Sequence, residues 1–162
     1  MDLSFIKSFN PELGGIFVIM CGPPGCGKTT LANELVNDYN FVRISPDDIR
    51  EEICGDASDQ SKNVEVFNYV YKRIYNFLKS GVNVVYDATN CRTVYRFKMM
   101  DMVADLAKVK ICMTSKRPLY ECLHLNESRD RIVPGEVIER MYINMKKHPP
   151  VIFEGYDMIV GF

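Results

Sequence analysis

The sequence predicts an α/β fold, in which a parallel sheet of about five strands has helices on both faces. Short apolar runs alternate along the chain with longer amphipathic stretches, as in successive strand–helix–strand units. The first apolar run, residues 16–21, leads directly into a glycine-rich loop and then into a helical pattern. At 162 residues one domain is expected, and we assign it to residues 16–162, after an N-terminal arm and hinge of residues 1–15.

Five short apolar segments are expected to form the strands: 16–21, 41–44, 82–87, 109–113 and 156–160. The last of these is expected at an edge of the sheet. Ligands of open parallel sheets bind at the carboxyl ends of the strands. Polar residues that directly follow these segments are therefore candidates for a functional site.

Helical patterns fill the intervals between the strands. After the glycine-rich loop, apolar residues recur at the spacing of one helix face: Leu31, Ala32, Leu35 and Val36. Ser45 is expected to cap a second helix, with Pro46 in the first helical position and Asp48 closing a capping box.

Four more helices are expected at about 64–79, 93–107, 119–128 and 134–147, separated by loops that contain Gly, Pro or several polar residues. Two of them have apolar stripes that are expected to face the core. The stripe of the first contains Val64, Phe67, Tyr71, Ile74 and Leu78. The stripe of the second contains Val94, Phe97, Val103 and Leu106.

The composition is that of an ordinary globular protein, with 47% hydrophobic and 25% charged residues and a net charge of −1. It does not require a nucleic-acid partner. Basic residues outnumber acidic ones between residues 92 and 147, whereas acidic residues prevail before them. That basic half could follow a phosphate backbone, or it could simply be a solvated surface.

The six cysteines include no C-x-x-C pair, which argues against a zinc site and against a small disulfide scaffold. We interpret them as reduced thiols of a cytoplasmic protein. No signal peptide is evident, and the apolar runs are too short to span a membrane. Whether the chain associates with itself is left open by the sequence.

The glycine-rich loop fits G-x-x-x-x-G-K-[ST], the phosphate-binding P-loop, with the residues Gly22, Pro23, Pro24, Gly25, Cys26, Gly27, Lys28 and Thr29. Backbone N–H groups of such a loop, and the N-terminus of the helix after it, surround a polyphosphate. Lys28 can reach the outer phosphates, and the Thr29 hydroxyl can bind the accompanying Mg²⁺. With Thr30 next to them, these residues predict a site for a nucleoside triphosphate.

Several charged or polar residues are expected at the same edge of the sheet. Asp47 follows the second strand and shares a helix face with Arg50, so a carboxylate able to accept a hydroxyl proton lies beside a cation. Asp87 ends the third strand, where it could serve Mg²⁺ through water or position a substrate, and Asn90 follows it. Each Asp could instead only cap a helix, and acids such as Asp48 favour a helix's first turn without any catalytic role.

Four stretches together resemble the small P-loop kinases grouped with the phage-type polynucleotide 5′-hydroxyl kinases. They are the P-loop, the segments 45–50 and 86–90, and a lid stretch at 126–134, and they occur in that family's order. Pro46 departs from the Arg or Ser that relatives often have. The resemblance implies a three-layer P-loop kinase fold with a helical lid, with ATP as the phosphoryl donor and Mg²⁺ as its metal.

The resemblance also implies roles for single residues. The first Asp of D-D-x-x-R, the general base of that family, corresponds to Asp47, and the Arg that grips the phosphate 3′ to the acceptor nucleotide corresponds to Arg50. Asp87 corresponds to the carboxylate that supports the acceptor site. The lid arginine, which contacts the donor's outer phosphates, is matched best by Arg129, with Arg131 as the alternative.

These roles imply transfer of the ATP γ-phosphoryl group to the 5′-hydroxyl end of DNA or RNA. Lys28 would then hold the donor phosphates, Asp47 would be the general base and Arg129 would stabilise the transition state. Two alternatives remain open: a kinase of a nucleoside, an antibiotic or a nucleotide sugar, and a nucleotide-dependent binding or assembly module. No recognition motif in the sequence distinguishes DNA from RNA.

Overall fold

We describe the chain from a computed structural model, which covers residues 1–129 and 131–162. Asp130, in the middle of the expected lid stretch, lies outside the described residues. The five strands form one parallel sheet in the order β2-β3-β1-β4-β5. Their bounds are Ile16–Cys21 for β1, Phe41–Ile44 for β2, Asn83–Tyr86 for β3, Val109–Thr114 for β4 and Met158–Gly161 for β5. The predicted fold class is confirmed.

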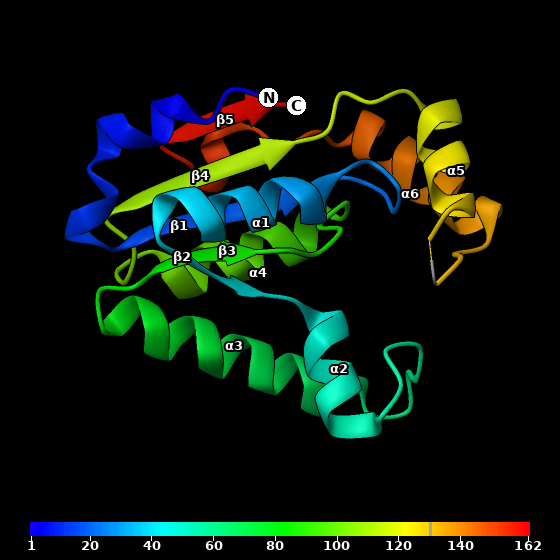
Figure 1. Ribbon diagram of the computed structural model, residues 1–162, viewed down its shortest axis with the longest axis horizontal. Coiled ribbons are helices and arrows are strands. Elements are labelled where there is room, and N and C mark those ends of the chain that lie inside the picture. Colours follow the sequence, from blue (N-terminus) through cyan, green and yellow to red (C-terminus); the bar gives the residue numbers. More distant parts are fainter. Residues whose placement is uncertain (130) are drawn as a thin grey trace.

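The sheet is the middle layer of three (Figure 1). The helices are α1 (Lys28–Tyr39), α2 (Pro46–Cys54), α3 (Asn63–Lys79), α4 (Thr93–Val103), α5 (Leu119–Glu127) and α6 (Gly135–Lys147). One face of the sheet packs against α1, and the other packs against α3 and α4. A short 3₁₀ helix, Ile152–Glu154, precedes the last strand.

All six residues of β1 are buried, as expected for the central strand of a sheet covered on both faces. Alternate side chains point to opposite faces, so Phe17 and Ile19 pack with α3 and α4, whereas Val18 and Met20 pack with α1. The P-loop follows this strand directly. The most deeply buried strand therefore fixes the start of the phosphate-binding loop.

The first fifteen residues form two short 3₁₀ helices, Ser4–Phe9 and Pro11–Leu13, before β1. Leu3 and Ile6 are buried in the apolar layer that contains α1. The Asn83 side chain donates to the carbonyl of Pro11 at 2.7 Å and accepts from the N–H of Ile16 at 3.0 Å. These contacts connect the N-terminal residues to the start of both β1 and β3.

Some expected details are wrong. In α3 the buried stripe contains Val66, Val70, Ile74 and Leu78, whereas Val64 is 78% exposed. In α4, Val94 and Phe97 lie on the exposed side, because Arg96, Met99, Met100 and Val103 face the core. Ile74, Leu78 and Val103 of the predicted stripes are buried as expected. The other errors arise because the prediction counted the buried Arg96 as polar and took exposed apolar residues as core.

Only the Ser45 half of the capping box predicted for α2 is present. Ser45 Oγ accepts from the N–H groups of Asp47 and Asp48, at 3.2 and 3.5 Å. The Asp48 carboxylate turns to Arg43 instead, accepting from its Nη1 at 2.8 Å. Asp48 thus contributes an ion pair at the end of β2, where the prediction had a capping box.

A helical hairpin of α5 and α6 extends beyond the sheet on the side of the P-loop (Figure 1). Its base is a small apolar cluster in which Cys122 and Ile138 pack with Cys26 of the P-loop. The Asn126 side chain donates to the carbonyl of Val133 and accepts from its N–H, at 2.8 and 3.1 Å. Within residues 1–129 and 131–162, no helix combines the length and the apolar character needed to cross a membrane.

Candidate functional site

The P-loop has a backbone conformation that only glycine adopts easily at two positions. Gly25 has a φ of 78° and Gly27 a φ of 95°, both in the left-handed region. A Cβ at Gly25 would also collide with the Cys122 carbonyl of α5. Gly27 caps α1, so the free N–H groups of the first turn are presented at the loop. This arrangement is that of an anion-binding loop.

The Lys28 side chain is folded along the loop and is only 8% exposed. Its Nζ donates to the Pro23 carbonyl at 2.8 Å and lies 3.6 Å from Cys26 Sγ. An ammonium group held by a loop carbonyl can turn to a phosphate without leaving the loop. Thr29 and Thr30 are exposed in the first turn of α1.

Asp87 lies beside the P-loop and is buried. Its Oδ2 accepts from Thr29 Oγ1 at 2.9 Å and from Arg43 Nε at 2.9 Å. A hydroxyl and a carboxylate at hydrogen-bond distance suit Mg²⁺, which takes few protein oxygens and fills its other positions with water and phosphate. Thr29 and Asp87 thus fit the metal that a P-loop implies.

Asp47 and Arg50 meet as their helical spacing predicts. Arg50 Nη1 donates to Asp47 Oδ1 at 2.6 Å, and Arg131 Nη1 of the lid approaches the same oxygen to 3.3 Å. The Asp47 side chain is 53% exposed, so it is accessible to a substrate. Arg131 also donates to the Ala57 carbonyl at 2.8 Å, which connects the lid with the loop after α2.

Arg50 is buried, which is unusual for an arginine. Its guanidinium also donates to the Ala57 carbonyl and to Asn63 Oδ1 of α3, at 3.2 and 3.0 Å. Among the side-chain atoms that the structure describes, Arg50 Nε is buried without a hydrogen-bond partner. Acceptors on α2, on the loop after it and on α3 thus hold the Arg50 guanidinium in place, while its Nε donor has no partner.

Two predicted site residues, Asn90 and Arg129, do not join the group around Asp47 and Asp87. The Asn90 side chain is buried and donates to the Met20 carbonyl at 2.7 Å, so it joins the loop after β3 to β1. Arg129 is exposed just beyond the end of α5, and its N–H donates to the Asn126 carbonyl. Of the two lid arginines, Arg131 is the one whose side chain reaches Asp47.

A family model described as an AAA domain matches residues 17–148 of the chain. The chain belongs to this AAA-domain family. An adenylate kinase from Mycoplasma mycoides subsp. mycoides SC is 35% identical over 104 residues, which are 58% of this chain and 48% of that kinase. The AAA-domain chain therefore spans about half the length of this curated relative.

Two solved structures share the fold of this AAA domain. A chain of the Pnkp1/Rnl/Hen1 RNA repair complex superposes with a TM-score of 0.74 at 21% identity, covering 83% of this chain and 45% of that one. A gluconokinase from Sinorhizobium meliloti 1021 gives a TM-score of 0.58 at 14% identity, covering 92% and 81%. At these identities the likeness shows the fold alone.

Sequence reasoning missed two arginines at the edge of the AAA domain's sheet. Arg43 bonds both Asp87 and Asp48, at 2.9 and 2.8 Å. Arg117, after β4, donates from Nε to the carbonyl of Cys26 at 3.3 Å and pairs with Glu121. Their positions in the sequence could have indicated both residues, because each is a charged residue at or just after the end of an expected strand.

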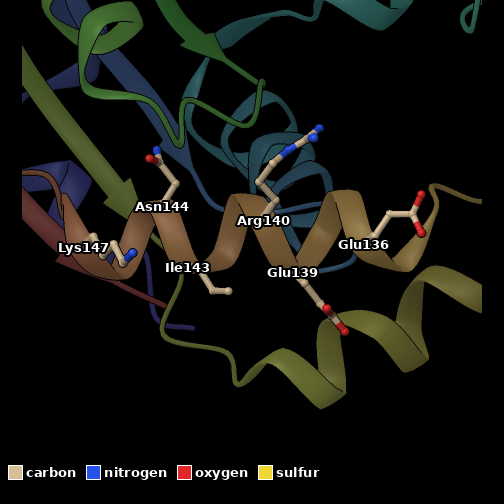
Figure 2. A pocket seen from close by; sticks show the side chains of 6 residues that line it. All are labelled: Glu136, Glu139, Arg140, Ile143, Asn144 and Lys147. Carbon is tan, nitrogen blue, oxygen red and sulfur yellow. The ribbon is translucent and has the colours of Figure 1, made fainter.

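Helix α6, which follows the lid stretch, carries a further cation. A shallow hollow of about 390 Å³ follows α6 and is lined by Glu136, Glu139, Arg140, Ile143, Asn144 and Lys147. Figure 2 shows Arg140 and Asn144 extending from the same side of α6. Asn144 donates to the Cys91 carbonyl in the loop that also carries Asp87. Arg140 therefore lies on the side of α6 that faces this loop.

The buried thiols near the P-loop stay protonated. Burial raises the pKa of Cys21 to about 11 and that of Cys91 to about 12. Burial likewise raises the pKa of Cys122, at the base of the lid, to about 11. Since the thiolate is the reactive form, these three residues serve the AAA domain as small apolar side chains.

Proposed function

We propose that the chain transfers the γ-phosphoryl group of ATP to the 5′-hydroxyl end of DNA or RNA. The observation that carries this proposal is the accessible carboxylate of Asp47, held between Arg50 and the lid residue Arg131 at the edge of the sheet that carries the P-loop. A donor site alone would suit a motor, a switch or a kinase. A carboxylate with a fixed cation beside it adds what an anionic acceptor with a free hydroxyl requires.

In this proposal the acceptor oxygen forms a bond to the γ-phosphorus, and the bond from that phosphorus to the β–γ bridging oxygen breaks, releasing ADP. Asp47 accepts the proton of the hydroxyl. Lys28 and the loop N–H groups bind the donor phosphates, and Thr29 and Asp87 would hold Mg²⁺. When bound, the metal offsets negative charge on the phosphate oxygens. A lid arginine, Arg129 or Arg131, adds positive charge where negative charge develops.

The unused Nε of buried Arg50 supports an anionic acceptor. A buried donor without a partner is unfavourable, and a phosphate oxygen would satisfy it. The phosphate on the 3′ side of the terminal nucleotide is such a group. The fold shared with a chain of an RNA repair complex is consistent with this acceptor.

The test is incubation with γ-labelled ATP, Mg²⁺ and a short oligonucleotide that ends in a 5′-hydroxyl. We expect label on this oligonucleotide and none on the same oligonucleotide with a 5′-phosphate. Asp47→Asn should lower the transfer rate about a hundredfold to ten-thousandfold, as expected for loss of a general base, while ATP binding persists. Absence of label with the unchanged protein would refute the function, and full activity of Asp47→Asn would refute the role of Asp47.

A kinase of a small molecule is the second candidate, because a relative that is 35% identical over 104 residues is an adenylate kinase. Such an enzyme would use the same donor site with a nucleotide, a nucleoside or a sugar as acceptor. It would have no use for a phosphate 3′ to the accepting hydroxyl. Comparison of adenosine with adenosine 3′-monophosphate as acceptors separates the two candidates.

A further inference from the structure

Aromatic and basic side chains alternate beside the candidate acceptor site, on α3 and α4. We call this group the strip, and its members are Phe67, Tyr71, Arg92, Tyr95 and Lys98. Lys98 Nζ lies 4.7 Å from the centre of the Tyr71 ring, and the Arg92 guanidinium lies 4.9 Å from the centre of the Tyr95 ring. The rings of Phe67 and Tyr71 are 6.3 Å apart. Two helices thus share one surface of rings and cations.

The strip begins at the candidate site. Arg92 directly precedes α4, which follows the loop that carries Asp87. Phe67 and Tyr71 follow about one and two helical turns after Asn63 of α3, whose side chain accepts a hydrogen bond from Arg50 at 3.0 Å.

The cations of the strip are available to a ligand. Tyr95 and Lys98 are three residues apart on α4 and so share a face of this helix, while Arg92 is the N-cap residue before it. All three are exposed, Tyr95 to 51%. Within the described part of the chain, neither Arg92 nor Lys98 forms an ion pair with a carboxylate. Lys98 lies over the Tyr71 ring, and Arg92 lies over the Tyr95 ring and donates to the Tyr95 hydroxyl at 3.1 Å.

We infer that the strip binds the nucleotides that follow the first one of a single-stranded acceptor. Bases would stack on Tyr71 and Tyr95, and the linking phosphates would contact Lys98 and Arg92. Grooves for single strands combine these two features, since every base has a face that can stack and every linkage has a charge. This inference rests on the proposed function, and it makes the acceptor a polynucleotide whose second and later residues contribute to binding.

The first test compares acceptors of increasing length at saturating ATP: a nucleoside 3′-monophosphate, a dinucleotide and a hexanucleotide, each with a 5′-hydroxyl. We expect kcat/KM of the unchanged protein to rise with length. Tyr95→Ala and Lys98→Ala should lower the ratio of the hexanucleotide to the mononucleotide value about fivefold to a hundredfold, the usual effect of removing a stacked or phosphate-contacting side chain. Both side chains are exposed, so neither change should unfold the protein.

The chain offers a matched control. Lys79 Nζ lies 5.4 Å from the Tyr75 ring, an equivalent pair at the C-terminal end of α3. Helices of a parallel α/β domain begin at the carboxyl edge of the sheet, so this pair lies far from the site. Lys79→Ala and Tyr75→Ala should leave the length ratio as it is. If the strip variants behave like these controls, the inference is wrong although the labelled oligonucleotide still supports the function.

A second test measures binding without catalysis. The chain contains no Trp, so Tyr71→Trp creates a single tryptophan in the strip, and Tyr75→Trp creates a single tryptophan at the control position, each excited selectively near the red edge of tyrosine absorption. We expect a hexanucleotide to quench Trp at position 71 and not at position 75. An abasic chain of the same length should bind with little quenching. Equal quenching at the two positions, or none at either, would overturn the inference whatever the activity assay shows.

Discussion

Arg43 links Asp48 of α2 to Asp87, which directly follows β3. It donates to Asp48 from Nη1 and to Asp87 from Nε. Asp87 also accepts from Thr29 of the P-loop, so the arginine contacts the side chain next to the expected metal site. Its positive charge offsets a buried carboxylate that would otherwise repel the phosphates of a bound nucleotide.

We expect Arg43→Ala to lower kcat about tenfold, because Asp87 would lose the cation that fixes its orientation and offsets its charge. Steady-state kinetics over a range of Mg²⁺ concentrations measure this effect. Arg73→Ala is the matched control, since Arg73 pairs with Glu52 on the exposed surface of α2 and α3, where an ion pair contributes little. Equal kcat for the two variants would exclude a role for Arg43 at the site.

Two contacts of the site could be predicted from the sequence. The Asp47–Arg50 pair follows from helical periodicity, and the Thr29–Asp87 contact follows from two strands that end at one edge. Arg43 was missed because its role depends on the register in which it lies beside Val85 of β3. Register between strands that are distant in the chain cannot be deduced from spacing along one of them.

At the scale of elements, a buried ion pair joins α4 to the 3₁₀ helix before β5. Arg96 is fully buried and donates to both oxygens of Glu154, each at 2.7 Å. It also donates to the Asn90 carbonyl at 3.2 Å and to the His148 carbonyl at 3.0 Å. This arginine therefore holds the loop after β3, which carries Asp87. Local sequence patterns do not indicate this pair, because its partners are 58 residues apart.

Glu154→Gln leaves the Arg96 charge buried without a counter-charge and should lower the free energy of unfolding by about 3–5 kcal/mol. The double variant Arg96→Met with Glu154→Leu should recover much of this loss, because apolar pairs often replace buried ion pairs. Urea unfolding gives both values. We also expect the double variant to have a reduced kcat, since the Asn90 carbonyl has lost its donor. Equal stability of the single variant and the unchanged protein would contradict this account.

The N-terminal 3₁₀ helix is part of the apolar layer that contains α1, through the fully buried Ile6. Ile6→Ala should therefore lower the free energy of unfolding by about 2–4 kcal/mol, as expected for a core residue. Leu13→Ala is the control, because Leu13 is 69% exposed and its loss should have little effect. Similar values from thermal or urea unfolding would show that the N-terminal residues do not contribute to the core.

For the whole molecule, features that depend on neighbouring residues could be predicted, whereas features that depend on residues far apart in the sequence could not. The parallel sheet and its five strands follow from alternating patterns along the chain. The order β2-β3-β1-β4-β5 does not, because it depends on which crossovers place α1 and α3 on opposite faces. The buried faces of α3 and α4 were also predicted only in part, since exposed aromatic residues such as Phe97 look like core residues in sequence.

The buried thiols predict how the stability of the whole chain depends on pH. In the unfolded chain cysteines lose their protons near pH 9, whereas burial raises the pKa of Cys21 and Cys122 to about 11 and that of Cys91 to about 12. Between pH 9 and 11 the unfolded state thus binds fewer protons than the folded state, so stability falls as pH rises. Below pH 8 these groups contribute no pH dependence.

Urea unfolding at pH 8, 9, 10 and 10.5 measures this decline. Cys91→Ala should make it shallower, because one group with a raised pKa is gone, even though the variant is less stable at every pH. A decline equally steep in this variant would mean that the thiol does not contribute to the pH dependence.

The most direct test of the proposed function compares three small acceptors: adenosine, adenosine 3′-monophosphate and adenosine 5′-monophosphate. We predict that label from γ-labelled ATP enters the 5′-hydroxyl of the 3′-monophosphate with a kcat/KM far above that of adenosine. Arg50→Gln should remove this preference while the KM for ATP changes little. Transfer to the 5′-phosphate of adenosine 5′-monophosphate, or equal use of adenosine and its 3′-monophosphate, would contradict a nucleic-acid end as the acceptor.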